Sequence, residues 1–149
     1  MQLKWHLKRK QKEDYIRCCD TYIRQATARF GEFHPVLSEL YDLFSAYHLN
    51  CSQFEDAIIF SKSSLVNILK VCGGSHERTS ECYYHLALCY IRANRKDEAI
   101  VHIRKSKLIF ENNRKTHSVA YATMSLKLAL LLLNQDEIGE CLNITAAAL

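Results

Sequence analysis

The sequence has few residues that interrupt helices. It contains one proline and four glycines in 149 residues. Both residues are unfavourable inside helices, so their scarcity favours helix over strand. No segment shows the strict alternation of apolar and polar residues that marks a half-buried strand. The composition therefore predicts an all-α protein.

Long hydrophobic runs are missing as well. The longest uncharged apolar run, residues 128–133, is far shorter than the roughly 18 residues that suggest a membrane-spanning helix. The basic residues near the N-terminus are not followed by an apolar segment, which argues against a secretory signal. We therefore expect a cytoplasmic protein without a membrane span.

The motifs of common catalytic sites are also absent. The chain has no HExxH, no glycine-rich phosphate loop and no GxSxG. Function has to be argued from a site, and no catalytic site is visible here. We therefore expect no enzymatic activity, no catalytic residues and no cofactor.

The seven cysteines form no CxxC pair, and their odd number shows no disulfide framework. This favours a reducing, cytosolic compartment. Cys82, His85 and Cys89 share one helix face at i, i+3 and i+7, and thiolates with imidazole suit zinc. A structural zinc site needs four ligands, and the fourth would have to come from another helix. We therefore expect these three side chains to pack in the core, with no metal bound.

Positive charge is concentrated at the N-terminus. Residues 1–30 hold eight Lys or Arg against three Asp or Glu, whereas the rest of the chain is nearly balanced. Such a basic arm suits nucleic acid, an acidic lipid surface or an acidic partner, and Trp5 adds a ring on which a base can stack. The alternative is a solvated helix face. Nothing in residues 31–149 extends the patch, so we expect the solvated face and do not expect nucleic acid as a partner.

What the sequence does contain is a recurring unit. The run YYHLALCY at 83–90 is followed by KDEAI at 96–100. One unit earlier, YDLFSAYH at 41–48 is followed by FEDAI at 54–58, and one unit later LALLL at 128–132 is followed by EIGEC at 137–141. A fixed period of this size, about 42 residues, indicates stacked helical units, none of which buries its apolar face alone. Such stacks present binding surfaces more readily than closed pockets.

Helical spacing and turn residues give a coarse map. We expect a basic helix over 3–30, either continuous or divided near Glu13, followed by helix pairs over 35–50 and 53–72, 77–94 and 96–112, and 117–134 and 136–148. The repeats would then be 31–72, 73–113 and 114–149, within one domain spanning 1–149. Asn50, Asn94 and Asn134 are expected as left-handed caps at helix ends. His34, His76 and His117 fall near helix starts, where we expect a role in the turn and not in metal binding.

The repeat resembles the tetratricopeptide repeat. The small residue that this family has at the eighth position of its first helix matches Ala87 and Ala129, with Ser45 in the first unit. The family's tyrosine three residues later matches Tyr90, and its alanine at position twenty matches Ala57 and Ala99, with Cys141 in the last unit. The resemblance implies a right-handed α-solenoid of about three repeats after the basic helix. The spacing of 42, with Gly-x-x-His-Pro before the first unit, is similar to a subset that includes kinesin light chain and nephrocystin.

The resemblance also implies a function and a site. Tetratricopeptide arrays bind a peptide or a partner helix in a groove lined by their first helices, and this subset suggests cytoskeletal, transport or ciliary assembly. Carried over residue by residue, the groove positions are Glu39, Asp42, Asn50, Glu81, Tyr84, His85, Leu88, Arg92, Lys127 and Asn134. Of these, Arg92 and Lys127 are the expected receivers of a peptide carboxylate.

Two further expectations concern the context of the chain. The helical lobe of SET-and-MYND lysine methyltransferases uses similar repeats, so an auxiliary lobe of a larger enzyme is the alternative to a free-standing scaffold. The chain ends on an amphipathic, apolar stripe, although solenoids need polar capping helices. We therefore expect it to be a piece of a longer protein, or to self-associate through its C-terminal helix.

Overall fold

The computed structural model of the protein describes residues 2–133, 144 and 146, with side chains from residue 10 onward. The helices in this range are α1 (Gln2–Phe30), α2 (Pro35–Asn50), α3 (Phe54–Cys72), α4 (Glu77–Arg92), α5 (Lys96–Asn112) and α6 (Val119–Leu133). The described residues contain no strand, and every helix in this range begins and ends within two residues of the expected bounds. The expectations for Asn134 and Cys141, and for the helix at 136–148 apart from residues 144 and 146, concern residues outside the described part of the chain.

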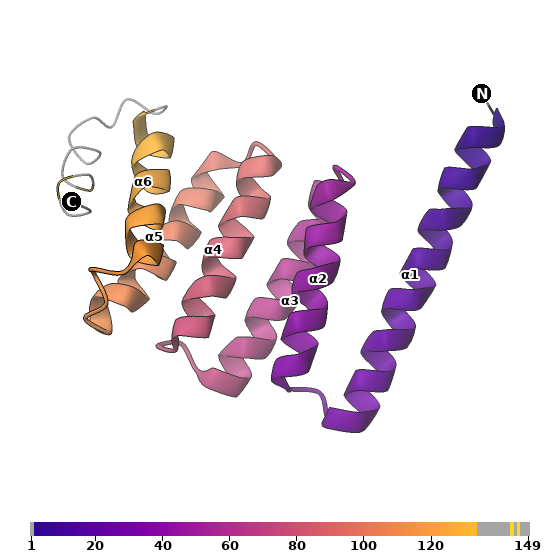
Figure 1. Cartoon of the computed structure of the whole chain (residues 1–149), viewed down its shortest axis with the longest axis horizontal. Helices are drawn as coiled ribbons and strands as arrows, with labels where there is room; N and C mark the ends of the chain where they lie inside the picture. The colour runs from indigo at the N-terminus through magenta and orange to yellow at the C-terminus, as the bar shows by residue number, and fades with distance from the viewer. Residues whose placement is uncertain (1, 134–143, 145, 147–149) are drawn as a thin grey trace.

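The helices are arranged as a row of antiparallel pairs (Figure 1). α2 packs against α3 and α4 against α5, and the two pairs meet where α3 contacts α4. α6 continues the row against α5, and α1 lies at the opposite end against α2. The expected α-solenoid with an N-terminal helix is confirmed, and α1 is one continuous helix.

Two of the three linker histidines begin helices. The Val36 amide donates to Nδ1 of His34 at 3.2 Å, and the Arg78 amide donates to Nδ1 of His76 at 3.1 Å. Each ring thereby satisfies one of the amides that the first turn of a helix leaves without a partner. At the start of α6 the Tyr121 amide donates to the hydroxyl of Ser118, the residue after His117, at 3.2 Å.

The turns inside the two described pairs share one conformation, and the asparagine prediction is correct at only one of them. Asn94 has a φ of 60° and lies in the left-handed region, as expected. Asn50, in contrast, is the last residue of α2, and the left-handed residue is Ser52 with a φ of 59°. Ser52 and Asn94 occupy equivalent positions in successive units, so the left-handed backbone conformation repeats with the 42-residue period although the asparagines do not. Position 52 was missed because serine carries no preference for positive φ.

Small residues mark where the helices of a pair cross. Ala57, Ala87 and Ala99 are completely buried. The hydroxyl of Ser45 donates to the carbonyl oxygen of Ala57 at 2.8 Å, which bridges α2 and α3 at the position equivalent to Ala87. A larger side chain at these positions would separate the helices, because protein cores are packed without spare volume. All three alanines are buried as expected, and the contact between Ser45 and Ala57 shows the close approach of α2 and α3 at this point.

Buried serines add a second contact that also repeats. Oγ of Ser38 lies 2.6 Å from Oγ of Ser64 across the α2–α3 pair. Oγ of Ser80 lies 2.7 Å from Oγ of Ser106 across the α4–α5 pair. Both pairs are fully enclosed, and the second pair stands one repeat period after the first. The sequence did not predict the burial of these serines, because isolated polar residues on a helix are usually exposed.

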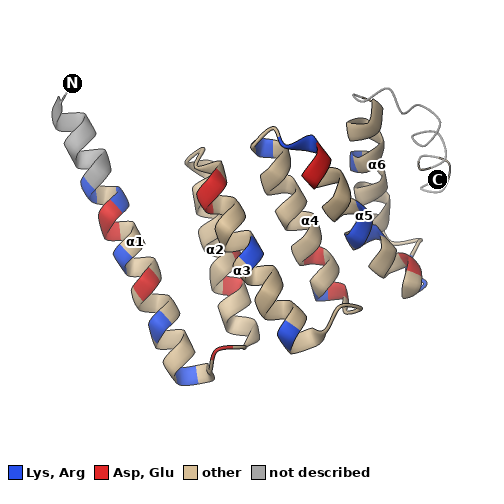
Figure 2. Cartoon of the chain, turned by 180° about the vertical axis from the view of Figure 1, so that it is seen from behind, with Lys and Arg blue, Asp and Glu red and all other residues tan. Residues whose placement is uncertain are grey.

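α1 packs on α2 through an aromatic contact. The Tyr15 ring stacks on that of Tyr47 with centroids 3.8 Å apart, and Cys19 is buried beside it. Beyond this contact the helix is largely exposed, and basic and acidic residues are interspersed along its described part (Figure 2). Lys12, for example, lies 3.9 Å from Asp56 of α3, with both side chains about half exposed. The remaining residues of the expected basic patch, near Trp5, have side chains outside the described set.

Candidate partner-binding groove

A groove of about 560 Å³ lies along α4, on the side of the stack that the first helices share. α2 borders it on one side and α6 on the other, with one side chain from α5. Five of the groove positions implied by the repeat lie in its lining: Asp42, Glu81, Tyr84, His85 and Leu88. The structure therefore brings together residues from separate repeats that are far apart in the chain.

The other implied positions do not line this groove. Glu39 and Asn50 are exposed on α2, and Lys127 is half-buried on α6. Arg92, at the end of α4, places its guanidinium over the ring of Phe54, 5.8 Å from the ring centroid. Arg92 and Lys127, the expected carboxylate receivers, are thus outside the groove. Asn134 lies outside the described residues.

Sequence analysis missed the rest of the lining, namely Glu77, Arg78, Phe110, Val119, Ala120, Thr123 and Met124. The repeat register could have identified one of them. Thr123 stands one repeat period after Glu81, a predicted groove position, so it occupies the equivalent position on the next first helix. The register could not identify Phe110, because that residue belongs to the second helix of its pair. It could not identify Arg78 either, because the place of Arg78 in the groove depends on ion pairs that the sequence does not show.

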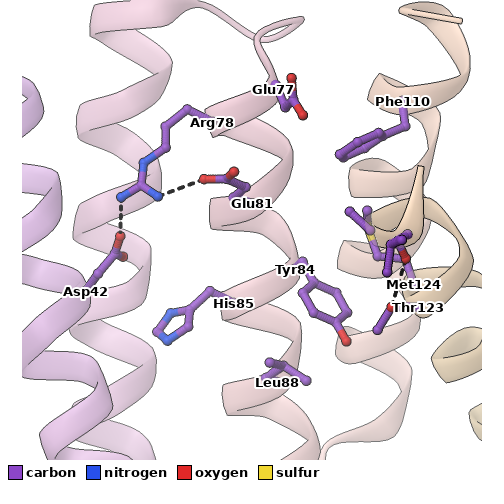
Figure 3. A pocket seen from close by; sticks show the side chains of 12 residues that line it. Asp42, Glu77, Arg78, Glu81, Tyr84, His85, Leu88, Phe110, Thr123 and Met124 are labelled. Atoms are coloured by element: carbon purple, nitrogen blue, oxygen red, sulfur yellow. Dashed lines mark hydrogen bonds and ion pairs between the residues drawn. The ribbon is translucent and has the colours of Figure 1, made fainter. Parts of the chain in front are cut away.

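Arg78 organises the charged part of the groove (Figure 3). One nitrogen of its guanidinium lies 2.9 Å from Oδ2 of Asp42 on α2, and another lies 2.7 Å from Oε2 of Glu81 on α4. The hydrogen bond to Glu81 and the charge of Asp42 raise the pKa of Arg78. Arg78 therefore links two repeats and carries a fixed positive charge between two carboxylates.

His85 lies below this cluster and points toward α2 (Figure 3). Its Nδ1 lies 3.2 Å from Oγ of Ser61 on α3. Burial lowers the pKa of His85; the charge of Asp42 acts in the opposite direction and that of Arg78 in the same direction. The imidazole is therefore neutral at neutral pH and serves as a polar contact between repeats.

The other side of the groove is apolar. This side is lined by Tyr84 and Leu88 of α4, Phe110 of α5 and Met124 of α6 (Figure 3). Burial raises the pKa of Tyr84, so its phenol stays protonated. The groove thus combines an ionic half against α2 with an apolar half against α6. This arrangement is suited to binding a surface with matching polar and apolar faces.

The nearby thiols pack as expected. Cys82 and Cys89 are buried, and their sulfur atoms lie 3.6 Å from Oγ of Ser64 and 3.4 Å from Oγ of Ser45. Burial raises the pKa of both thiols, which keeps them in the poorly nucleophilic protonated form. Among the described residues no group of three or more His, Cys, Asp or Glu side chains is placed to hold a metal ion.

No protein-family model and no curated protein sequence matches this chain. Solved structures do match in shape. BtubC (BKLC) from P. vanneervenii, a tetratricopeptide-like helical repeat protein, superposes with a TM-score of 0.73. The fold of this chain is a tetratricopeptide-like helical repeat. The match covers 93% of this chain and 56% of BtubC at 17% sequence identity, so it shows the fold alone. Assignment to the 42-residue subset stays a prediction.

The comparison with BtubC also bears on length. This chain spans a little over half of the BtubC structure. Within the described residues, no helix is long and apolar enough to cross a lipid bilayer.

Proposed function

We propose that this chain is a non-enzymatic protein-interaction scaffold, and that the groove along α4 binds a peptide or helix of a protein partner. The observation that carries this proposal is the groove itself, which holds Asp42, Glu81, Tyr84, His85 and Leu88 in one lining. In helix-in-groove recognition an amphipathic helix lays its apolar face into a hydrophobic groove, and the apolar half of this lining is suited to that mode. In this proposal residues 1–149 form one helical repeat domain.

The cellular setting belongs to the same proposal. The spacing of the repeat supports a cytoplasmic role in cytoskeletal, transport or ciliary assembly, through the resemblance described above. The tetratricopeptide-like fold supports protein partners in general. No contact among the described groove residues favours the alternative of an auxiliary enzyme lobe, so we keep the scaffold as the proposed function.

Affinity capture with matched variants tests this function. Leu88→Asp places a charge in the apolar half of the groove, and Leu108→Asp makes the same change at an exposed position on α5 outside it. Proteins captured from a cytosolic extract by the unmodified chain are quantified by mass spectrometry and compared with those captured by each variant. Circular dichroism checks that both variants keep their helices.

We expect at least one partner to be lost with Leu88→Asp and retained with Leu108→Asp. Identical sets of partners for all three proteins would show that the groove is not the binding surface. Loss with Leu108→Asp alone would place binding on the other side of the stack. Either of these results would overturn the proposal.

A further inference from the structure

The side of the groove formed by α2 and α4 is acidic. Its described lining contains the carboxylates Asp42, Glu77 and Glu81 but only one cation, Arg78. At the rim, Lys115 from the segment after α5 pairs with Glu77. Asp42 and Glu81 therefore share one guanidinium and together carry an excess negative charge.

The two carboxylates have unused acceptor capacity. Asp42 receives Arg78 at Oδ2, whereas its Oδ1 is buried and has no hydrogen-bond partner among the described residues. The Glu81 side chain lines the groove and is 53% exposed. Each carboxylate can accept several hydrogen bonds. The exposed carboxylate of Glu81 can therefore receive a second cation beside Arg78, whereas Asp42 can receive one only in place of Arg78, because its other oxygen is buried.

The side formed by α6 is apolar and open. Val119, Thr123, Leu126, Leu130 and Leu133 are all exposed, and their spacing places them on one face of the helix. Val119 and Thr123 line the groove, so the face continues from the groove along the helix. At 1.5 Å per residue the stripe is about 21 Å long, or about four helical turns. Exposed apolar stripes of this kind are characteristic of docking surfaces.

The repeat register places the acidic and apolar sides on equivalent helix faces. Val119 and Thr123 of α6 stand one repeat period after Glu77 and Glu81 of α4. Equivalent faces of neighbouring first helices border the same groove, so one border is charged and the next is apolar. A segment lying between them must be charged on one side and apolar on the other.

We infer that the groove takes an amphipathic helical segment of a protein partner that directs arginine or lysine toward Asp42 and Glu81 and leucine-like side chains toward α6. Charge complementarity selects a basic segment, because an acidic one would face the excess carboxylates. In the free protein Arg78 occupies the position of the partner's cation. This inference rests on the proposed function and specifies the chemistry of its ligand.

A synthetic peptide is a direct probe. The basic probe is a fluorescein-labelled peptide of about 15 residues, long enough to span the stripe at 1.5 Å per residue, with leucine on one helical face and arginine on the adjoining face. The acidic probe has glutamate in place of each arginine, and the scrambled probe keeps the basic composition without a continuous face. Binding is measured by fluorescence anisotropy at low and at moderate salt. We expect the basic probe to bind more tightly than both others and to weaken as salt is raised.

Two carboxylate variants locate the contact. Glu81→Gln removes charge inside the groove, and Glu39→Gln makes the same change on an exposed part of α2 outside it. One charge-assisted hydrogen bond contributes about 1.4 kcal/mol or more, which corresponds to about tenfold in affinity. We therefore expect Glu81→Gln to weaken binding of the basic probe by about tenfold. Glu39→Gln should weaken it by less than about twofold. Arg78→Ala removes the competing cation, so it is expected to strengthen binding of the basic probe several-fold. Thermal melting followed by circular dichroism shows whether each variant is folded.

These measurements distinguish failure of the basic-ligand inference from failure of the proposed function. Tighter binding of the acidic probe, or equal weakening by Glu81→Gln and Glu39→Gln, would overturn the basic-ligand inference. If the acidic probe also loses affinity with Leu88→Asp, the groove remains the binding site and only its ligand chemistry is wrong. If Leu88→Asp changes neither the binding of any probe nor the set of captured partners, the proposed function fails as well. A dimer in sedimentation that Leu126→Asp disrupts would identify a second copy as the occupant of the stripe and would overturn the inference.

Discussion

Ser80 on α4 and Ser106 on α5 contact each other through both of their hydroxyl groups. Their hydroxyl oxygens lie 2.7 Å apart, and each also lies 2.8 Å from the carbonyl oxygen of the other residue. Both side chains are completely buried. The pair therefore satisfies its own polar groups and also brings the two helix backbones close together.

Substitutions at Ser80 should distinguish the hydroxyl's hydrogen bond from the small size of the side chain. We expect Ser80→Ala to lower the free energy of unfolding by about 1 kcal/mol, the usual net value of one hydrogen bond. Ser80→Val should cost about 2 to 3 kcal/mol, because its extra methyl group also forces the helices apart. Urea unfolding followed by circular dichroism measures both. A valine variant as stable as the alanine variant would contradict close helix approach at this position.

The crossing at Ala87 predicts a similar sensitivity to volume. Ala87 is fully buried, whereas Ala46 is exposed on α2. We expect Ala87→Leu to destabilise the protein by about 1 to 3 kcal/mol through overpacking. The matched change Ala46→Leu should alter stability by less than about 0.5 kcal/mol. Equal effects in urea unfolding would show that the predicted crossing does not constrain the stack.

The turn at Ser52 offers room for stabilisation. Ser52 has a φ of 59°, a conformation that costs an L-residue roughly 1 kcal/mol and a glycine almost nothing. We expect Ser52→Gly to raise the melting temperature. The same change at Ser63, inside α3, should lower it, because glycine is unfavourable by about 1 kcal/mol in a helix interior. Differential scanning calorimetry on both variants checks the sign, and a decrease for both would exclude backbone strain at Ser52.

His85 predicts a pH dependence of stability. Its pKa in the folded protein is lowered by burial, whereas in the unfolded chain it is about 6.5. Between these two values the unfolded state binds more protons, so the free energy of unfolding falls as the pH drops below about 6.5. His102 of α5, whose pKa burial also lowers, contributes in the same direction.

The variant His85→Gln isolates one of these two contributions. Glutamine keeps a polar group near Ser61 but does not titrate. We expect the decline in stability over this pH range to become shallower, without disappearing, because His102 still titrates. Urea unfolding at several pH values measures the slope. An unchanged slope would show that His85 is not protonated on unfolding in this window.

The helical architecture could be predicted because it follows from local and periodic information. The apolar spacing, the scarcity of breakers and the repeat period gave helix bounds within two residues across the described range. The small residues Ala57, Ala87 and Ala99 marked the crossings because close packing admits little else there. The period also aligned Ser52 with Asn94, although asparagine alone pointed to Asn50.

The groove could be predicted only in part. The resemblance to tetratricopeptide repeats implied Asp42, Tyr84 and Leu88, which are carried over from the family's groove positions. It could not show that Arg78 reaches Asp42 in the preceding repeat, because an ion pair between repeats depends on side-chain direction. Nor could it show that Arg92 lies over the ring of Phe54, away from the groove. The sign of the groove's charge therefore emerged only from the structure.

The central claim is that the groove along α4 contacts the partner, and site-specific crosslinking tests it most directly. The photoreactive residue p-benzoylphenylalanine is introduced in place of Tyr84, inside the groove, or in place of Leu108, on α5 outside it. Each protein is irradiated in cells, and the crosslinked products are separated and identified by mass spectrometry. The account predicts a discrete partner adduct from position 84 and none from position 108. An adduct from position 108 with none from position 84 would contradict it.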